Sequence, residues 1–434
     1  MSELKDLFPL GTTLTPDGHL QIAGHELGAL AGQWGTPLYV YDALTVRTHI
    51  QDLQAWLKQA YPGAAEITYA AKAYFSAGFA RKLAAMDIGV DVVSLGEMEV
   101  ARLGGFQPER VHLHGNNKSE QELCRALELG LHNVVLDSLE EIDFLEEIAG
   151  RLGKSMRVWL RLTPGVNIHT HPHIQTGHAA SKFGFSIHGG QAAEGIHRLR
   201  GSRWLKLTGL HTHLGSQITE PEAYRQAIHS MYALAGQEGF IPQEFSPGGG
   251  WGVAYTFEDQ PQDGETWIRT VADALAQECS RRDWPLPRLY LEPGRWLAGR
   301  AGVALYTAGT GKVLEDGTYI VAVDGGMADN PRPALYQARY QAFVVDRPQA
   351  PASRRTSLVG KFCESGDKLI PETFLPPVQR GDVLALPVAG AYQLSMASNY
   401  NLAARPTVLW LDAGQVEVLQ KQERPEISGW WVDV

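Results

Sequence analysis

The stretch RVHLHGNNKSEQELCRALELGLHNVVLDSLEEIDFLEEIAGRLGKSMRVWLRL (110–162) alternates short apolar runs with longer amphipathic segments. Three of the runs predict buried strands: RVHLH (110–114), NVVLD (133–137) and MRVWLRL (156–162). The segments between them carry apolar residues at helical spacing, and Ser119 followed by Glu122 is typical of a capping box at a helix start. Strand and helix in repetition predict parallel strands joined by right-handed crossovers.

The same alternation extends on both sides, from about residue 65 to about residue 295. It adds five apolar runs: EITYA (66–70), VDVVS (90–94), LKLTGLH (205–211), QEFS (243–246) and RLYLE (288–292). Eight strands alternating with helices favour an α/β fold with a closed (β/α)8 TIM-type barrel over an open sheet.

Both ends of the chain have a different pattern, with short alternating apolar runs separated by Gly and Pro. This pattern predicts a mostly β domain built from residues 1–40 and 300–434, with the barrel occupying 41–299. The pair Asp316–Gly317 indicates a hairpin turn within the β domain. The Pro-rich and charged segment 345–357 is predicted to be an exposed loop.

The composition excludes several classes of protein. The chain has 38 Lys+Arg against 48 Asp+Glu, a net charge of −10, which argues against a nucleic acid or an anionic membrane as the main partner. Three cysteines are too few for a disulfide framework. No apolar run reaches the roughly 20 residues of a membrane span, and the first residues lack a signal-peptide core. We therefore expect a cytoplasmic protein.

Polar residues follow the predicted strands, at the end of a barrel where chemistry takes place. They are Lys72, Asp91, Ser94, Asn116, Arg161, His213, Ser216, Gly248–Gly250 and Glu292–Arg295. A purely structural barrel has no need for so many polar groups at one end, so the pattern favours an active site. Four histidines in HTHPHIQTGH (169–178) lack an accompanying carboxylate or cysteine, and we expect a polar loop there and no metal site. His112, His114 and His211 are expected in the barrel wall.

Two of these features favour a specific chemistry. Lys72 lies among small apolar residues, and burial there would lower its pKa and make the amine a nucleophile for a carbonyl group. The alternative is a lysine in solvent. PGGGWG (247–252) offers backbone N–H groups to a phosphate, or forms only a tight turn. Its place after the seventh strand, with EPGR (292–295) after the eighth, favours phosphate binding.

Eleven motifs in order carry a family resemblance: YAAKA (69–73), GVDVVSLGEMEVA (89–101), GNNKS (115–119), TGHAASKFG (176–184), GLHTHLGSQI (209–218), GGG (248–250), EPGR (292–295), DGGM (324–327), RPALY (332–336), CESGD (363–367) and GAYQLSMASNYN (390–401). Together they resemble the diaminopimelate decarboxylases, which belong to the pyridoxal-phosphate decarboxylases with the alanine-racemase-type fold (the ornithine, diaminopimelate and arginine decarboxylase family). The resemblance covers about residues 35–405.

The resemblance implies roles for residues that match those motifs. Lys72 would bind the aldehyde of pyridoxal 5′-phosphate, His213 would stack on its ring, and Glu292 would pair with the ring nitrogen. Further cofactor residues would be Asp91, Ser216, Gly250, Gly294, Arg295 and Tyr392. Substrate would be bound by Arg295, Arg332, Tyr336, Glu364 and Tyr392. Cys363 would be a catalytic proton donor, and Asp91 and Arg161 would position Lys72.

The implied reaction is decarboxylation of meso-diaminopimelate to L-lysine and CO2. A carboxylate at the ring nitrogen favours decarboxylation, since racemases of this fold place an arginine there. Arg332 could bind the distal carboxylate of diaminopimelate in a bidentate manner, which a substrate lacking that group could not use. The alternatives are decarboxylation of ornithine, D-lysine, arginine or carboxynorspermidine, and a non-catalytic regulator. The resemblance also implies a homodimer in which CESGD reaches the partner's active site.

Two positions depart from the family pattern. Tyr74 stands where an asparagine is usual, and Lys361–Phe362 replace a pair such as Pro-Leu before CES. Both departures lie near residues to which the resemblance assigns a role.

Overall fold

The computed structural model describes residues 4–166 and 181–424, and the chain divides into two compact units. The barrel unit comprises His49–Gly252 and Pro261–Trp296, and the β unit comprises Met1–Thr48, Val253–Gln260 and Leu297–Val434. The division therefore falls at 48/49 and 296/297, compared with the expected 40/41 and 299/300, and a short segment after the glycine loop groups with the β unit.

The barrel unit contains a closed ring of parallel strands, as the alternating pattern predicts. Its strands are β5 (Ala65–Ala70), β6 (Gly89–Val92), β7 (Val111–Leu113), β8 (Asn133–Leu136), β9 (Met156–Thr163), β11 (Leu205–His211), β12 (Glu244–Ser246) and β13 (Arg288–Leu291). Parallel pairing of β8 with β9 and of β13 with β5 closes the ring. A short strand, β10 (Phe185–Ser186), pairs with β9 and was not predicted.

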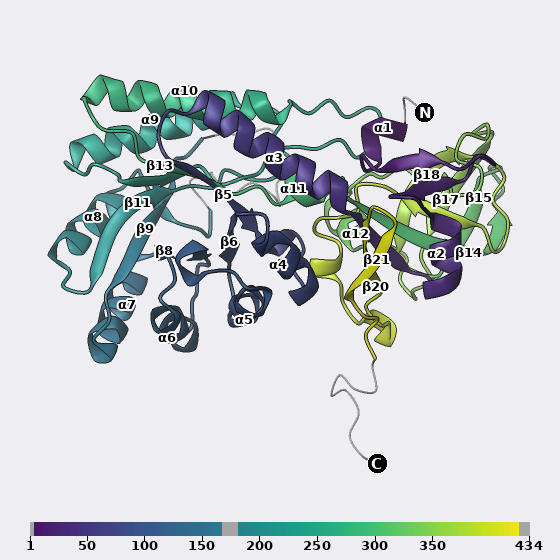
Figure 1. Ribbon diagram of the computed structural model, residues 1–434, viewed down its shortest axis with the longest axis horizontal. Coiled ribbons are helices and arrows are strands. Elements are labelled where there is room, and N and C mark those ends of the chain that lie inside the picture. The colour runs from purple at the N-terminus through teal and green to yellow at the C-terminus, as the bar shows by residue number, and fades with distance from the viewer. Residues whose placement is uncertain (1–3, 167–180, 425–434) are drawn as a thin grey trace, which may run out of the picture. The chain divides into compact units, whose positions relative to one another are not determined.

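Helices on the outside of the ring connect successive strands (Figure 1). They are α4 (Ala77–Ala84), α5 (Leu95–Gly104), α6 (Glu120–Leu129), α7 (Leu139–Leu152), α8 (Gln191–Gly201), α9 (Glu222–Gln237) and α10 (Gly264–Arg282), with α3 (Ala43–Ala60) before β5. The predicted capping box is confirmed, because Ser119 Oγ accepts the Glu122 N–H and the Glu122 carboxylate accepts the Ser119 N–H. Side chains of Ser76, Ser94 and Ser138 cap three other helices in the same way.

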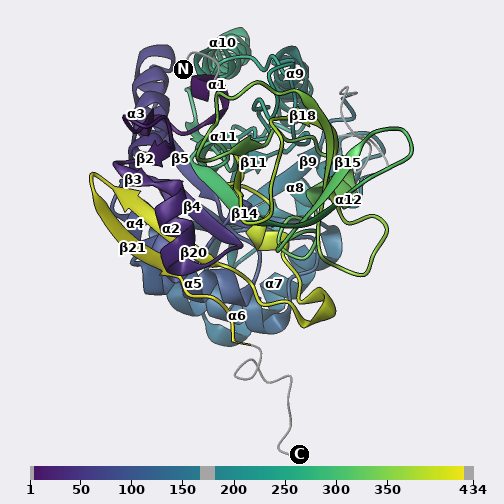
Figure 2. The same ribbon diagram turned by 90° about the vertical axis from the view of Figure 1, so that its right-hand side faces the viewer.

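The β unit is built from both ends of the chain, as expected. One sheet runs in the order β18-β17-β15-β14-β4-β20-β21, and β19 pairs with both β14 and β16. These strands are β4 (Leu38–Asp42), β14 (Gly302–Val313), β15 (Tyr319–Val323), β16 (Phe343–Val344), β17 (Arg354–Val359), β18 (Lys368–Leu375), β19 (Val383–Leu386), β20 (Thr407–Asp412) and β21 (Gln415–Gln420). In Figure 2, β20 lies between β4 and β21, with which it pairs.

The remaining described elements are short. They are α1 (Leu4–Leu7), β1 (Thr12–Leu14), β2 (Leu20–Ile22), β3 (His25–Glu26), α2 (Leu27–Trp34), α11 (Arg295–Ala298), α12 (Arg332–Tyr336) and the 3-10 turns η1 (Ala71–Ala73), η2 (Pro108–Arg110), η4 (Leu394–Met396) and η5 (Tyr400–Leu402). No helix in the described part of the chain is long and apolar enough to cross a membrane.

The local predictions for the β unit are partly right. Asp316–Gly317 does connect β14 and β15, and Gly317 has a φ of 85° that suits this turn. The predicted loop 345–357 is wrong at its end, because β17 begins at Arg354 and buries Thr356 and Ser357. Three consecutive residues of β17, Thr356 to Leu358, are buried, and the polar character of the first two hid the strand in the sequence. Threonine suits a strand as a β-branched residue, although its hydroxyl makes the sequence read as polar.

Candidate active site

The side chain of Lys72 lies just after β5, at the end of the barrel where the strands finish. It sits in the turn η1 between Ala71 and Ala73, which are both buried, while Lys72 itself is exposed. The expectation of a buried amine is therefore wrong, although the charge of Lys72 still acts on the buried groups Asp91 and His211 at this end of the barrel. The exposed amine is accessible to a carbonyl compound.

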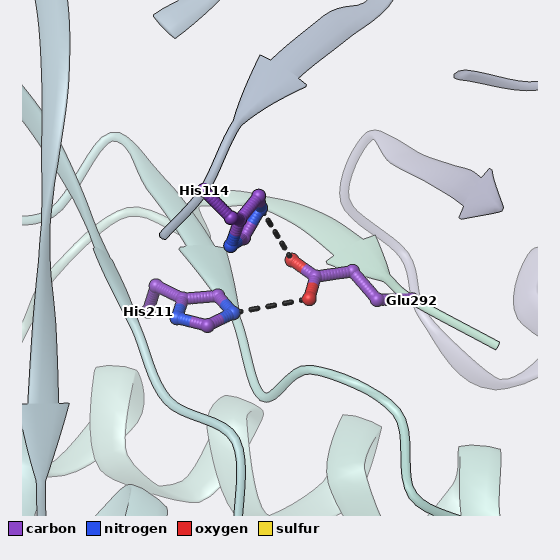
Figure 3. Close-up of side chains that lie close together, drawn as sticks. All are labelled: His114, His211 and Glu292. Carbon is purple, nitrogen blue, oxygen red and sulfur yellow. Dashed lines mark hydrogen bonds and ion pairs between the residues drawn. The ribbon is translucent and has the colours of Figure 1, made fainter. Parts of the chain in front are cut away.

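Glu292 is buried at the same end of the barrel and is surrounded by hydrogen-bond donors (Figure 3). Its Oε2 accepts from Nε2 of His211 at 3.0 Å, and its Oε1 accepts from the hydroxyl of Ser246 at 2.7 Å. His114 Nε2 lies 3.7 Å from Oε1. Both histidines lie at the ends of barrel strands and are buried, as expected of the barrel wall, but their position next to Glu292 was not predicted.

Asp91 and Arg161 are close enough to Glu292 to interact with it electrostatically. Burial raises the pKa of Asp91 well above its usual range, and the charge of Glu292 raises it further while Lys72 opposes the shift. Arg161 is half-buried, with Nε 4.0 Å from Asp137 Oδ1 and its guanidinium 4.3 Å from the Phe183 ring. Asp137, the last residue of the run NVVLD, was not predicted as its partner.

His213 follows β11 and contacts the glycine loop. The N–H of Gly249 donates to its Nδ1 at 3.4 Å, and the hydroxyl of Tyr224 donates to the Gly249 carbonyl. Burial, with the charges of Lys72 and Arg161, lowers the pKa of His213 well below its usual value. The ring is therefore neutral and held by the loop, which leaves it suited to a stacking contact with a flat ligand.

The glycine loop differs from the expected phosphate cradle. The N–H groups of Gly248 and Gly249 donate within the protein, to Ser246 Oγ and His213 Nδ1. At Gly250, which has a φ of 104°, an added Cβ would lie 2.1 Å from the Gly215 carbonyl oxygen. The glycines thus allow two backbone segments to approach each other closely. Trp251 is buried and stacks on Trp267, a packing role.

A cation and a hydroxyl meet beside this loop. Arg295 is buried at the start of α11, and its Nη2 donates to Ser216 Oγ at 2.8 Å. Gly294, also buried, precedes it in the chain. Residues expected after the sixth and eighth strands therefore lie together in the barrel unit and provide donors for an anion.

The β unit holds the residues assigned to the distal end of the substrate. Arg332 is buried at the start of α12, and its Nη1 donates to the Tyr340 hydroxyl at 2.5 Å. Its guanidinium carbon lies 4.5 Å from the ring centre of Tyr255. Tyr336, at the end of α12, is half-buried. Sequence reasoning missed both tyrosine partners of Arg332, because they are distant in the chain from RPALY or outside its motif.

Cys363 lies in an exposed loop of the β unit that is fixed from two sides. Its N–H donates to Asn401 Oδ1 at 3.1 Å, and the Tyr400 hydroxyl donates to its carbonyl at 3.2 Å. Asp367 is buried beneath the loop and accepts from the N–H groups of Met327 and Phe362, at 2.6 and 2.9 Å. The ends of the loop are held while the thiol remains accessible.

Glu364 and Tyr392 are the other assigned residues of the β unit. Glu364 is exposed next to Cys363, and its N–H donates to the Phe362 carbonyl at 2.8 Å. Tyr392 is half-buried with a φ of 62°, a left-handed conformation that is costly for a tyrosine. Such strain is typical of functional positions.

The two departures from the family pattern have structural explanations. Tyr74 is buried, packs 5.4 Å from the Phe79 ring and donates its hydroxyl to Ser76 Oγ at 3.2 Å. It therefore supports the start of α4. Lys361 is exposed, whereas Phe362 is buried and packs on the edge of Tyr400. The histidine-rich segment 169–178 lies outside the described residues.

Comparisons with known proteins agree with this geometry. Residues 47–299 match the family described as pyridoxal-dependent decarboxylase, pyridoxal binding domain. The chain is 40% identical to the diaminopimelate decarboxylase of Bacillus subtilis (strain 168) over 416 residues, 94% of each protein. It is also 40% identical to that of Staphylococcus aureus (strain COL), over 94% of this chain and 96% of the relative.

Solved structures support the same grouping. The crystal structure of diaminopimelate decarboxylase from M. jannaschii in co-complex with L-lysine matches with a TM-score of 0.89 and 29% identity, over 98% of this chain and 99% of the other. This agreement includes both the barrel and the β sheet. The chain therefore belongs to the pyridoxal-dependent decarboxylases and, within them, to the diaminopimelate decarboxylases.

Proposed function

We propose that the chain decarboxylates meso-diaminopimelate at its D-centre, producing L-lysine and CO2. Similarity over nearly the whole length of several diaminopimelate decarboxylases supports this reaction. The structural observation that carries it is the buried carboxylate of Glu292 at the barrel's active end.

Pyridoxal 5′-phosphate is the cofactor of this family, and the donor set fits it. Lys72 offers an accessible amine for the aldehyde, and Glu292 offers a carboxylate for the ring nitrogen. Arg295 and Ser216, 2.8 Å apart beside the glycine loop, supply a cation and a hydroxyl for the phosphate. When bound, the cofactor supplies a sink for the electron pair left at Cα when CO2 departs.

The residues of the chain have separate tasks in this reaction. Glu292 would hold a negative charge next to the ring nitrogen, which would favour the protonated form of that nitrogen and direct the chemistry to decarboxylation. His213 would support the ring from one face. Cys363, accessible on its fixed loop, gives the proton that replaces CO2 at Cα. Asp91, buried and electrically coupled to Lys72, positions the amine.

Selection of diaminopimelate depends on Arg332. The guanidinium is buried and oriented by Tyr340, so a distal substrate carboxylate meets a preorganised bidentate partner. Ornithine or lysine lacks this carboxylate and would leave a buried charge unpaired, which costs much of the binding energy. Glu364 faces the ammonium group of the same end.

We also propose that the chain acts as a homodimer in the cytoplasm, with the Cys363 loop completing the active site of the partner subunit. The exposed thiol on a well-held loop supports a role at a neighbouring molecule. All three cysteines of the chain are free, in keeping with a reducing compartment.

A direct assay tests the proposal. The purified protein, supplied with pyridoxal phosphate, is mixed separately with meso-diaminopimelate, ornithine, D-lysine, arginine and carboxynorspermidine while CO2 release is followed. We expect turnover of diaminopimelate above all others. Faster turnover of another substrate contradicts the specificity, and absence of an absorbance band near about 420 nm with cofactor supports a non-catalytic regulator. Borohydride reduction followed by peptide mapping should label Lys72.

A further inference from the structure

Glu292 lies among side chains from three other strand ends of the barrel: His211 and Ser246 donate hydrogen bonds to it, and His114 lies close by without a hydrogen bond. His211 is the last residue of β11, Ser246 the last of β12, Glu292 follows β13, and His114 follows β7. The side chains of His211, His114 and Glu292 are 1%, 7% and 6% exposed. Each carboxylate oxygen has one donor within 3.0 Å, so the carboxylate cannot rotate without losing a bond in a buried site.

His211 provides this support without adding charge, and its neighbour His114 is also kept neutral. Burial lowers the pKa of His211 well below its usual value, and the charges of Arg161 and Lys72 lower it further. Burial likewise lowers the pKa of His114, although the charge of Glu292 opposes the shift. A neutral imidazole can donate a hydrogen bond to the carboxylate while leaving its negative charge available to another group.

The unpaired nitrogen of His211 fixes which tautomer is present. Its Nδ1 is buried and has no hydrogen-bond partner among the described residues, while Nε2 faces Glu292. A proton on Nε2 forms a good hydrogen bond, whereas a proton on Nδ1 would be buried without an acceptor.

The same observation argues against a metal ion here. The ligand atoms of His114, His211 and Glu292 lie within 4.8 Å of one another, which is close enough to hold one. A metal on Nε2 of His211 would force the proton onto Nδ1, and metal-binding histidines nearly always have an acceptor at that second nitrogen.

We propose that His211 is a positioning residue that acts through Glu292 and fixes the carboxylate in the direction of the cofactor's ring nitrogen, while the His114 ring packs edge-on against His211, 4.8 Å between ring centres. This inference rests on the proposed function, in which Glu292 has that partner. The two histidines of the sequence His211-Thr212-His213 then have separate tasks: His213 contacts the cofactor ring, and His211 orients the Glu292 carboxylate.

The test uses His211→Phe, which keeps the size of the ring and removes the donor, and His211→Gln, which restores a neutral N–H donor. His112→Phe is the matched control, because His112 is also buried in the barrel but bonds the neutral side chain of Asn133 at 3.1 Å. We expect His211→Phe to lower kcat and cofactor affinity, measured by titrating the apoprotein with pyridoxal phosphate, by about tenfold or more. KM for diaminopimelate should change less than about threefold, and His211→Gln should recover most of both losses.

A double-mutant cycle separates this inference from the proposed function. If Glu292→Gln has normal cofactor affinity and turnover, the proposed role of Glu292 fails. If Glu292→Gln has reduced cofactor affinity and turnover, but His211→Phe has the same kcat and cofactor affinity as His112→Phe, only the positioning role of His211 fails. Because His211 acts through Glu292, adding His211→Phe to Glu292→Gln should cost no further cofactor affinity. Stoichiometric zinc in the purified protein, lost in His211→Gln or His211→Phe, would overturn the proposal in favour of a metal site.

Discussion

Arg332, buried on α12, donates a hydrogen bond from Nη1 to the hydroxyl of Tyr340, and its guanidinium carbon lies 4.5 Å from the ring centre of Tyr255. The two tyrosines hold the cation from its edge and from its face. Burial lowers the pKa of Arg332, but the neighbouring tyrosines outweigh this effect and the pKa is raised. The guanidinium therefore stays charged and ready for a carboxylate.

Removing the Tyr340 hydroxyl should weaken substrate binding. In Tyr340→Phe the guanidinium loses its edge partner and its preferred orientation, so KM for diaminopimelate should rise by about fivefold to tenfold with kcat little changed. Arg332→Ala should raise KM by about 100-fold or more, because a charge-assisted pair is lost. Steady-state kinetics measures both changes.

Tyr61→Phe is a matched control for that variant. Tyr61 is buried and donates its hydroxyl to the Pro287 carbonyl, near the opposite ends of the barrel strands. The Tyr61→Phe variant should reduce thermal stability about as much as Tyr340→Phe does but leave KM for diaminopimelate unchanged. Equal KM values for the two variants would show that Tyr340 does not orient Arg332 for substrate.

The close approach at Gly250 predicts a defect in cofactor binding. Gly250→Ala strains a backbone with a φ of 104° and also brings Cβ to 2.1 Å from the Gly215 oxygen, next to Ser216. Gly18→Ala has similar strain, at a φ of 88°, but its Cβ meets nothing within 4 Å. Both should lose about 1–2 kcal/mol of stability from the backbone alone. Gly250→Ala should in addition lower affinity for pyridoxal phosphate at least about tenfold, as measured by titration of the apoprotein. Equal affinities would rule out a role for the glycine in shaping the site.

Asp329 makes the stability of the β unit depend on pH. Burial raises its pKa to about 6, although hydrogen bonds from Tyr306, Gly326 and Tyr39 oppose the shift. The unfolded chain releases this proton near about pH 4, so between about pH 4 and pH 6 the folded protein binds more protons and the free energy of unfolding falls as pH rises. A pKa difference of about 2 between the folded and unfolded chain changes the free energy of unfolding by about 3 kcal/mol.

Asp329→Asn isolates this contribution. The difference in unfolding free energy between the wild type and Asp329→Asn should fall by about 3 kcal/mol from about pH 4 to pH 7, as measured by urea denaturation. A constant difference for Asp329→Asn would mean that the buried carboxyl does not hold a proton in this range.

Mixing two inactive variants tests the dimer. Lys72→Ala should have no turnover because the amine is lost, and Cys363→Ala should have a greatly reduced kcat because the proton donor is lost. If the Cys363 loop serves the partner's site, a hybrid of the two has one intact site, and an equal mixture should regain about one quarter of the wild-type activity. No recovery in a mixture shown to contain hybrid dimers would mean that each subunit supplies its own cysteine.

The sequence predicted best what depends on neighbouring residues. Apolar runs identified the eight barrel strands, and the spacing of Ser119 and Glu122 identified a helix start, because both depend on local periodicity. The position of Lys72 after β5 followed from the same pattern. The exposure of Lys72 did not follow from this pattern, because small neighbours indicate tight packing without indicating which side chain stays accessible.

The contacts that were missed join residues far apart in the chain. Glu292 meets His211 and Ser246 only because β11, β12 and β13 are adjacent in the ring, and the tautomer of His211 depends on what its other nitrogen meets. Tyr255 reaches Arg332 from a segment that follows the glycine loop. Register and side-chain direction decide such contacts, and neither can be read from composition or spacing.

The barrel sheet closes on itself, whereas the main sheet of the β unit has open ends at β18 and β21. Open edges can recruit strands from other molecules and start fibrils. In β18, Pro371 has no N–H to offer, and its pairing with β17 is interrupted between Ile370 and Thr373. Lys368 and Glu372 add exposed charges along the same strand. This edge is therefore a poor template for the addition of a strand from another molecule.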